Sequence, residues 1–322
     1  MGGLVGRVDR LQQQHRVLGF GYAVVRKYLD DGGGREAALI TYYGFLSIFP
    51  VLLLGVTIVS RVLAARPDLR HRLIEAFVPS SLRSSVDSAA AAMPTSAVPL
   101  TIGIIGLLFS GAGVVFSAYH TVNHLAAVPY RLRHGIVSWL LRVLVVLVLL
   151  LAGVVAVGGL TVAVTVVPGL SAMPQAAAAL GSWLIGYGVL LLAARLLLSR
   201  PAPVRALWPG AALGATALTV VLTVGAAVLP GLVRRAGAVY GGFAAVAGMF
   251  SLLYVLSLAL VFAAEVAAVR QGRLWPRALD RDRPTVADAR ALALQAREQE
   301  RDPADRIEPR TAAPSAARAG PS

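Results

Sequence analysis

Six apolar runs without a charged residue occupy much of the sequence, and they decide what kind of structure it can form. They cover residues 37–60, 98–119, 143–167, 180–194, 206–229 and 240–264. A helix needs about 20 apolar residues to cross the hydrocarbon core of a bilayer. The fourth run reaches this length only by continuing through Arg195 to Leu198, with the guanidinium extending to the headgroups. The pattern predicts an all-α, polytopic membrane protein with six transmembrane helices.

The composition supports this prediction and excludes several other classes of protein. Hydrophobic residues make up 57% of the 322 residues and charged residues only 14%, against about 25% charged residues in soluble domains. The sequence contains no cysteine, which excludes thiolate-bound zinc, iron–sulfur clusters and cysteine nucleophiles. No other pattern requires a cofactor, so we expect none.

Basic residues set the expected orientation of the chain. It carries 30 Lys and Arg against 16 acidic residues, a formal net charge of +14. Most of these cations fall in the segments that share a side of the membrane with both chain ends, and basic segments remain on the cytoplasmic side. We therefore predict an N-in/C-in topology.

The segments outside the spans divide the chain into three parts. Residues 1–35 form a cytoplasmic segment in which Leu18, Tyr22, Val25 and Leu29 recur at helical spacing, which predicts an amphipathic helix on the membrane surface. Residues 36–270 form the six-helix transmembrane domain. Residues 271–322 are rich in charge and proline, which predicts a disordered charged cytoplasmic tail whose residues 286–300 are helical at most transiently.

The first outer loop is expected to carry one or two further helices at the membrane surface. Leu69, Leu73, Phe77 and Leu82 fall on one face of a helix there, between charged residues of both signs. Such a face would lie in the headgroup region.

One string in the first span carries a family resemblance. Residues 41–50 read TYYGFLSIFP, with Tyr42, Ser47 and Pro50 at the spacing of the signature of the YihY/BrkB family of bacterial inner-membrane proteins. The string resembles that signature, and later landmarks follow in the family's order over about residues 35–270. The resemblance implies a six-span protein of the bacterial cytoplasmic (inner) membrane, often described as a transporter; an older ribonuclease BN-like label also exists.

Polar groups at membrane depth are costly, which makes them the first candidates for function. Tyr42, Tyr43 and Ser47 lie within about one and a half helical turns of one another. They precede Pro50, a residue that leaves backbone carbonyls without their helical partner. These four residues are candidates for the wall of a substrate path. Hydrogen bonding between helices is the alternative interpretation.

Glu265, at the inner end of the last span, is a further candidate. It either binds a cation or a proton in a cytoplasmic vestibule or anchors the helix end near Arg270. The family resemblance adds Asn123 and Tyr240 to the substrate-path candidates. We predict that the inner half of one vestibule is lined by Tyr42, Ser47, Asn123 and Glu265.

Basic and imidazole groups suggest two other kinds of site. Arg131, Arg133 and Arg205 are candidates for binding inner-leaflet headgroups, although the positive-inside rule alone explains them. His120 and His124 share a helix face at the spacing of zinc-binding helices. The glutamate of that motif is missing and no third ligand is fixed, so we predict no metal site and keep a pH-sensitive pair as the alternative.

These features favour a transporter, flippase or export factor for a lipid-linked or amphipathic anion, with membrane lipids as partners. The ATP motif GxxxxGK[ST] is absent, so any coupling would use an ion gradient or another protein. A non-transporting scaffold for envelope assembly is the alternative function. A nuclease is disfavoured because the spans offer no cluster of carboxylates to hold metals, and no nucleic-acid partner is expected.

Pairs of small residues bear on how the helices associate. Gly210 and Gly214 form a GxxxG pair, and Ser182 and Gly186 a second pair of small residues. Such pairs let helices approach closely in lipid. Packing within the chain is the favoured interpretation, and a homo-oligomer stays open as the alternative.

Overall fold

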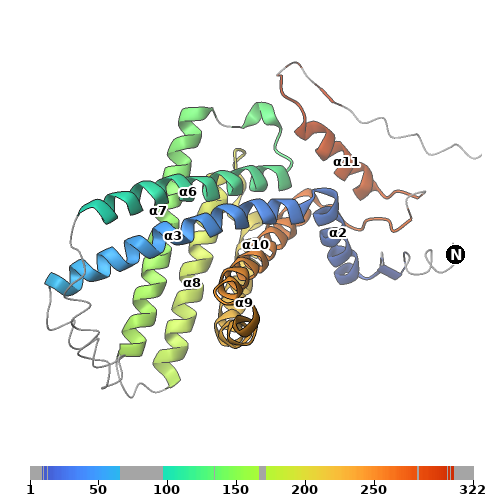
Figure 1. Ribbon diagram of the computed structural model, residues 1–322. Coiled ribbons are helices and arrows are strands. Elements are labelled where there is room, and N and C mark those ends of the chain that lie inside the picture. Colours follow the sequence, from blue (N-terminus) through green and yellow to red (C-terminus); the bar gives the residue numbers. More distant parts are fainter. Residues whose placement is uncertain are drawn as a thin grey trace, which may run out of the picture.

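The computed structural model describes residues 9, 11–12, 14–65, 97–133, 135–166, 172–280, 283–302, 304 and 306–307. These residues form helices and connecting turns, with no strand among them. Figure 1 labels the principal helices, which are α2 (Arg16–Asp30), α3 (Gly33–Ala65), α6 (Ala97–Leu125), α7 (Ile136–Val166), α8 (Ala172–Leu197), α9 (Val204–Tyr240), α10 (Phe243–Gly272) and α11 (Val286–Glu298). A 3-10 turn, η2 (Tyr130–Leu132), lies between α6 and α7.

Six of these helices are long and apolar enough to cross a membrane, which confirms the predicted number of spans. They are α3, α6, α7, α8, α9 and α10. The fourth, α8, continues through Arg195 to Leu197 and also begins earlier than the charge-free run, at Ala172. The predicted interfacial helices at Leu69 to Leu82 lie outside the described residues.

All six helices are longer than the charge-free runs, and the extensions of α7 and α9 contain arginines. α7 begins before Arg142, whose Nη1 donates a 2.7 Å hydrogen bond to the Leu196 carbonyl at the end of α8. A cation satisfied in this way does not end a helix. α9 continues through Arg234 and Arg235 to Tyr240, so these arginines lie on a helix and the connection to α10 shortens to a turn at Gly241, where φ is +55°.

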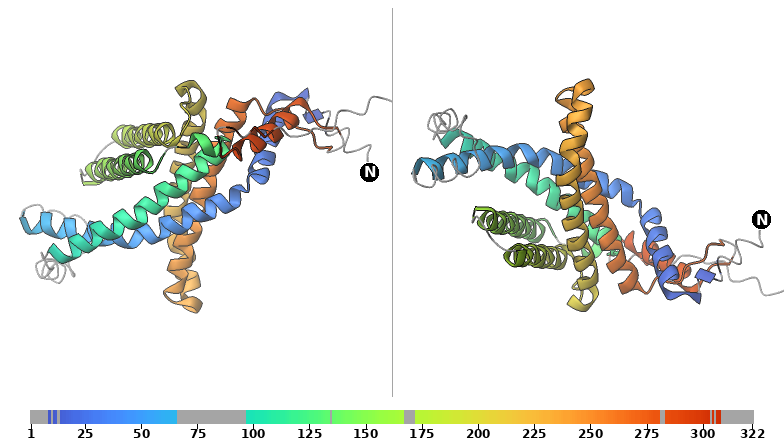
Figure 2. Two further views of the ribbon diagram at one scale, coloured as in Figure 1. Left: turned by 90° about the horizontal axis from the view of Figure 1, so that it is seen from above. Right: turned by 90° about the horizontal axis from the view of Figure 1, so that it is seen from below.

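The six spans form three antiparallel hairpins, α3 with α6, α7 with α8 and α9 with α10. Figures 1 and 2 show that the hairpins meet at one end and diverge toward the other. The buried clusters follow this arrangement, with Val115, Val146 and Leu197 in one cluster and Ala37, Leu125 and Val261 in another. We call the meeting point the convergent end. The apolar side chains that stay exposed on the diverging hairpins suit contact with acyl chains.

α2 and α11 both pack at the convergent end (Figure 1). α2 ends in a turn at Asp31 and Gly32, where a φ of +65° favours glycine, and the chain then reverses into α3. A helix, α2, occupies residues 16–30 of the segment in which one was predicted, with Leu18, Val25 and Leu29 exposed on it. Whether this exposed strip lies on a membrane stays a prediction.

The C-terminal segment differs from the predicted disordered tail. Ala287 and Ala291 of α11 are buried, and Ala291 belongs to a cluster with Ala23 of α2, Val269 of α10 and Leu274. The prediction is therefore wrong for the described part of residues 273–302. The composition predicted disorder because the segment has too few apolar residues to fold alone. The segment folds by packing against α2 and α10.

The GxxxG pair lies inside the α9/α10 hairpin, as the favoured interpretation required. A Cβ atom on Gly210 would lie 2.7 Å from the Ala263 carbonyl oxygen, and one on Gly214 would lie 3.4 Å from the Ala263 Cβ. At Gly186 a Cβ would meet nothing within 4 Å. Both glycines of the GxxxG pair therefore allow α9 to approach α10 of the same chain.

We expect Gly210→Ala to destabilise the protein by about 1–3 kcal/mol, because the new methyl group forces two backbones apart. Gly186→Ala is the matched control and should leave the stability unchanged or slightly raised, since Ala favours helix. Thermal unfolding of the two purified variants in detergent measures the difference. Equal melting temperatures would contradict the close packing at Gly210.

Candidate functional site

An ionisable group from α2 reaches into the convergent end of the bundle. Lys27 is the only lysine in the sequence and is 7% exposed. Its Nζ donates a 2.8 Å hydrogen bond to the Leu125 carbonyl oxygen at the end of α6. The same ammonium pairs with Asp31, one turn along α2, and lies 3.1 Å from Glu265 Oε2 of α10. One cation thus joins three helices.

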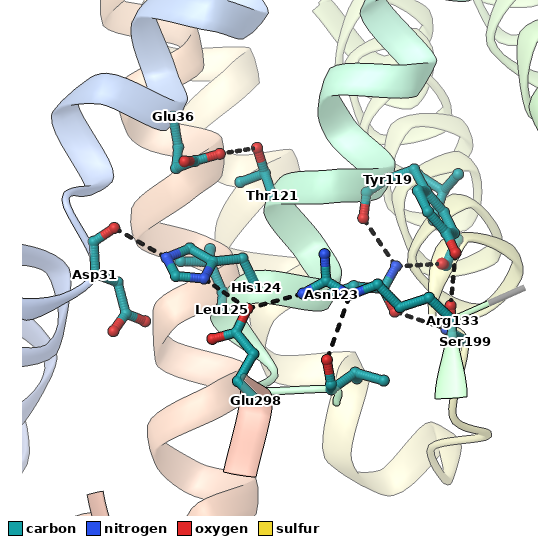
Figure 3. A network of polar contacts seen from close by, with 12 residues as sticks. Asp31, Glu36, Tyr119, Thr121, Asn123, His124, Leu125, Arg133, Ser199 and Glu298 are labelled. Carbon is teal, nitrogen blue, oxygen red and sulfur yellow. Dashed lines mark hydrogen bonds and ion pairs between the residues drawn. The ribbon is translucent and has the colours of Figure 1, made fainter. Parts of the chain in front are cut away.

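A second polar group surrounds His124, near the end of α6 (Figure 3). Its Nδ1 lies 2.8 Å from Glu298 Oε1, and its Nε2 lies 3.1 Å from the Asp31 carbonyl oxygen. Arg133 Nη2 lies 2.8 Å from the same Glu298 oxygen, with its guanidinium 3.9 Å above the Tyr130 ring. Glu298 at the end of α11 is therefore held by two groups from the α6–α7 region.

A second ion pair joins the same two segments of the chain. Arg131 Nε lies 2.9 Å from Glu300 Oε2, and the Arg131 amide donates a 3.1 Å hydrogen bond to the Glu300 carbonyl. The arginines predicted to bind headgroups in this loop are thus neutralised by the C-terminal segment. Arg205, the third of them, is exposed on α9.

Asn123 joins α6 to the end of α8, as Figure 3 shows. Its Nδ2 donates to the carbonyls of Tyr119 and Leu197 at 2.8 and 2.9 Å, and its Oδ1 accepts a 2.8 Å hydrogen bond from the Ser199 amide. Asn123 is fully buried. The side chain satisfies backbone groups that the end of α8 would otherwise leave without a partner.

α11 is fixed at its start by a capping box. Thr285 and Asp288 exchange hydrogen bonds between side chain and backbone, and Arg277 Nε lies 2.6 Å from Asp288 Oδ1. Arg277 also pairs with Asp30 of α2 at 2.9 Å. Burial disfavours ionisation of Asp288, but hydrogen bonds from the Ala278 and Thr285 amides, the Thr285 hydroxyl and Arg277 outweigh it and hold its pKa below the ordinary value.

The lowered pKa of Asp288 predicts how docking of α11 depends on pH. Because the folded-state pKa lies below the unfolded value of about 3.9, the stabilisation is present at higher pH and is lost as the pH falls through the folded-state pKa. The protection of α11 amides against hydrogen exchange, taken relative to the intrinsic exchange rate at each pH, should therefore stay constant from neutral pH to about pH 4 and decrease below it.

Asp288→Asn should accelerate that exchange already at neutral pH and weaken its dependence on acid. Asp302→Asn is the control, because the Asp302 carboxylate accepts a hydrogen bond from Ala304 beyond the helix. Exchange in Asp288→Asn that matches the wild type at every pH would contradict the role of this cap.

Two adjoining cavities lie at the convergent end. The first, which we call the polar chamber, has a volume of about 400 Å³ and is lined by Lys27, His124, Arg200, Gln295 and Glu298 among others. The second, the apolar cavity, has a volume of about 280 Å³ and lies among all three hairpins. Both cavities share four lining residues, Leu125, Ala126, Ala268 and Gln271.

The side chains predicted to line one vestibule do not converge. Glu265 and Asn123 are buried at the convergent end, whereas Tyr42 is 54% exposed on α3. Ser47 donates a 2.9 Å hydrogen bond to the Tyr43 carbonyl of its own helix. The prediction was wrong on this point because the position of a residue along a span gives its depth in the membrane, but not the direction in which its side of the helix faces.

The other first-span and last-span candidates take different positions. The Tyr43 ring lies over Gly113 of α6, and Pro50 lies against Gly106 of the same helix. Both residues thus pack the α3/α6 hairpin. Tyr240 is exposed at the far end of α9, in an apolar groove of about 630 Å³ between α9 and α10.

His120 and His124 line one pocket of about 460 Å³, together with Glu36, Tyr43 and Arg133. The His120 ring packs edge-on against Phe116 and Tyr119. Among the described residues, no group of three or more His, Cys, Asp or Glu could hold a metal ion.

Lys27 and Glu298 are the functional candidates that sequence reasoning missed. A lysine four residues before Asp31, in a chain that otherwise uses arginine, was a usable signal for Lys27. Nothing in the sequence pairs Glu298 with residues of the α6–α7 loop.

Comparison with known proteins shows the family. Residues 24–288 match the family described as Virulence factor BrkB. The chain belongs to the BrkB family. This match and the six apolar helices identify a multi-pass integral membrane protein. No curated protein and no solved structure matches the chain.

The BrkB match is longer at both ends than the resemblance seen in the sequence. It begins within α2 and ends at Asp288, in the first turn of α11. Lys27 and Glu265 therefore lie inside the BrkB region, whereas Glu298 and Glu300 lie beyond it.

Proposed function

We propose that this BrkB-family protein is a transporter, flippase or export factor for a lipid-linked or amphipathic anion in the bacterial inner membrane, with its convergent end in the cytoplasm. The observation that carries the proposal is the contact between the polar chamber and the apolar cavity. An amphipathic anion needs both environments, a cationic one for its head and an apolar one for its chain.

The charges of the polar chamber suit an anionic head. Arg200, between α8 and α9, is exposed and lines the chamber, and it makes no ion pair with any described residue. Lys27 lines the same chamber, as do the carboxylates of Asp31, paired with Lys27, and Glu298, paired with His124 and Arg133. Phosphate and carboxylate heads are bound by such donors through charge-assisted hydrogen bonds.

The arrangement of the hairpins suits the chain of the ligand. The apolar cavity is lined from α3, α6, α7, α8, α9 and α10, and the hairpins diverge beyond it (Figure 2). A chain that leaves the cavity between diverging hairpins would enter lipid directly. A membrane lipid is therefore the simplest substrate of this shape.

The test uses purified protein in phosphatidylcholine vesicles that carry a fluorescent phosphatidylglycerol in both leaflets. Chemical quenching from outside reports movement between the leaflets. We expect faster quenching of the inner pool than in protein-free vesicles. A fluorescent phosphatidylcholine, which lacks a net charge, should move more slowly.

Arg200→Gln should lower the rate for phosphatidylglycerol by about tenfold, the effect of losing one charge-assisted hydrogen bond. Arg195→Gln is the matched control, because Arg195 is also exposed, on α8, but does not line the chamber. Failure of the wild type to move either lipid would favour the non-transporting scaffold.

A further inference from the structure

The Lys27 site holds more negative than positive charge. Lys27, Asp31 and Glu265 are 7%, 6% and 0% exposed. One ammonium thus faces two carboxylates, and all three side chains are almost fully buried. An unpaired charge in such a place costs several kcal/mol, so the site as a whole favours one additional positive charge.

The other cations beside the site are directed at other carboxylates. His124 faces the site from α6 with both ring nitrogens against acceptor oxygens, so its ring is positively charged, and this charge is paired with Glu298. Arg277 is paired with Asp30 and Asp288. From α11, only the neutral amide of Gln295 reaches Asp31, at 3.1 Å.

The remaining neighbours add negative or neutral groups. Glu36 of α3 is buried and accepts a 2.8 Å hydrogen bond from Thr121 of α6. Tyr28 of α2 and Tyr254 of α10 are the nearby phenols, and Tyr28 stacks on Phe262 at 4.2 Å. Within the described part of the chain, Lys27 is therefore the one charged side chain within ion-pair distance of Glu265.

The geometry of Glu265 identifies which carboxylate is short of partners. Asp31 pairs with Lys27 and accepts from Gln295. Neither oxygen of Glu265 has a hydrogen-bond partner among the described residues, and only Oε2 lies within ion-pair distance of Lys27. A buried carboxyl with a vacant oxygen is a place where a proton can reside.

We propose that Glu265 is a proton-binding site that couples a proton to the anion in the polar chamber. The inference rests on the proposed function and extends it. Deprotonated Glu265 holds the Lys27 ammonium. A proton from water on the convergent side neutralises Glu265. Lys27, which also lines the polar chamber, keeps Asp31 and the Leu125 carbonyl as partners and can direct its third N–H, released by Glu265, to the anionic head. Proton and anion therefore bind together.

The first test measures the proton site without any ligand. Infrared difference spectra of the purified full chain in nanodiscs, recorded between about pH 8 and about pH 5, should show the carbonyl stretch of a buried carboxylic acid that titrates. Glu265→Gln should remove this band. Glu300→Gln is the matched control and should retain it. A Glu265→Gln spectrum that keeps every carbonyl band of the wild type would overturn the proposal.

The second test measures coupling with a short-chain phosphatidylglycerol as the probe. Its affinity for the wild type should rise as the pH falls, by up to about tenfold per pH unit, the limit for one linked proton. In Glu265→Gln the affinity should be high and independent of pH, whereas Glu300→Gln should follow the wild type. A wild-type slope retained in Glu265→Gln would overturn the coupling.

The two tests separate failure of the inference from failure of the proposed function. A titrating Glu265 band without probe binding at any pH would refute the anion-binding function, and the coupling with it, while establishing the proton site. Probe binding with the same affinity at every pH would support the anion site and refute the coupling.

Discussion

Lys27→Met should destabilise the protein by about 3–5 kcal/mol, the usual effect of removing one partner from a buried group of charges. The loss is large because Lys27 serves Asp31, Glu265 and the Leu125 carbonyl at once. Unfolding of the purified protein in mixed detergent micelles, followed by circular dichroism, measures the change.

The adjacent residue on α2 provides the control. Arg26 forms an ion pair of the same spacing with Asp30 at 3.2 Å, but both side chains are partly exposed. Arg26→Met should therefore cost less than about 1 kcal/mol. The double variant Lys27→Met/Glu265→Gln should recover part of the lost stability because one carboxylate has been removed. Equal losses in Lys27→Met and Arg26→Met would contradict the buried site.

The second large effect is expected at Asn123. Asn123→Ala leaves the Ser199 amide and the Leu197 carbonyl without their partner, at about 1–3 kcal/mol for each buried group. The end of α8 should loosen, and hydrogen exchange at Ser199 should accelerate together with the loss of stability.

Ser47→Ala tests whether any lost side-chain hydrogen bond would have this effect. Ser47 donates only to the Tyr43 carbonyl within α3, so its removal should change stability by less than about 1 kcal/mol. An Asn123→Ala variant as stable as Ser47→Ala would show that the contact between α6 and α8 is not a stabilising one.

The spans were predictable from the sequence because their length and polarity are set by the bilayer and need no knowledge of neighbours. Their limits were less predictable. Arg142 precedes the third apolar run and was expected to lie outside the span. It lies inside α7, where the Leu196 carbonyl accepts a hydrogen bond from its guanidinium. That carbonyl belongs to another helix, and sequence spacing does not reveal it.

In the candidate site, too, individual residues were predictable from the sequence, but their partners were not. Glu265 and Asn123 were identified from the cost of polar groups in membranes and from the family resemblance. Their partners were not, because Lys27 comes from a helix outside the spans and Ser199 from a connecting turn. The directions of the helix faces, and hence the dispersal of Tyr42 and Ser47, depend on tertiary packing.

The pairing of Arg131 and Arg133 with Glu300 and Glu298 has a consequence for biosynthesis. The ribosome makes these arginines long before the two glutamates, so the loop after α6 carries its full positive charge while the first three spans insert. It can therefore orient the nascent chain at that stage. The same charges are neutralised once residues 298–300 have been made. Arginines that can act on topology during insertion therefore hold the C-terminal segment in place in the folded protein.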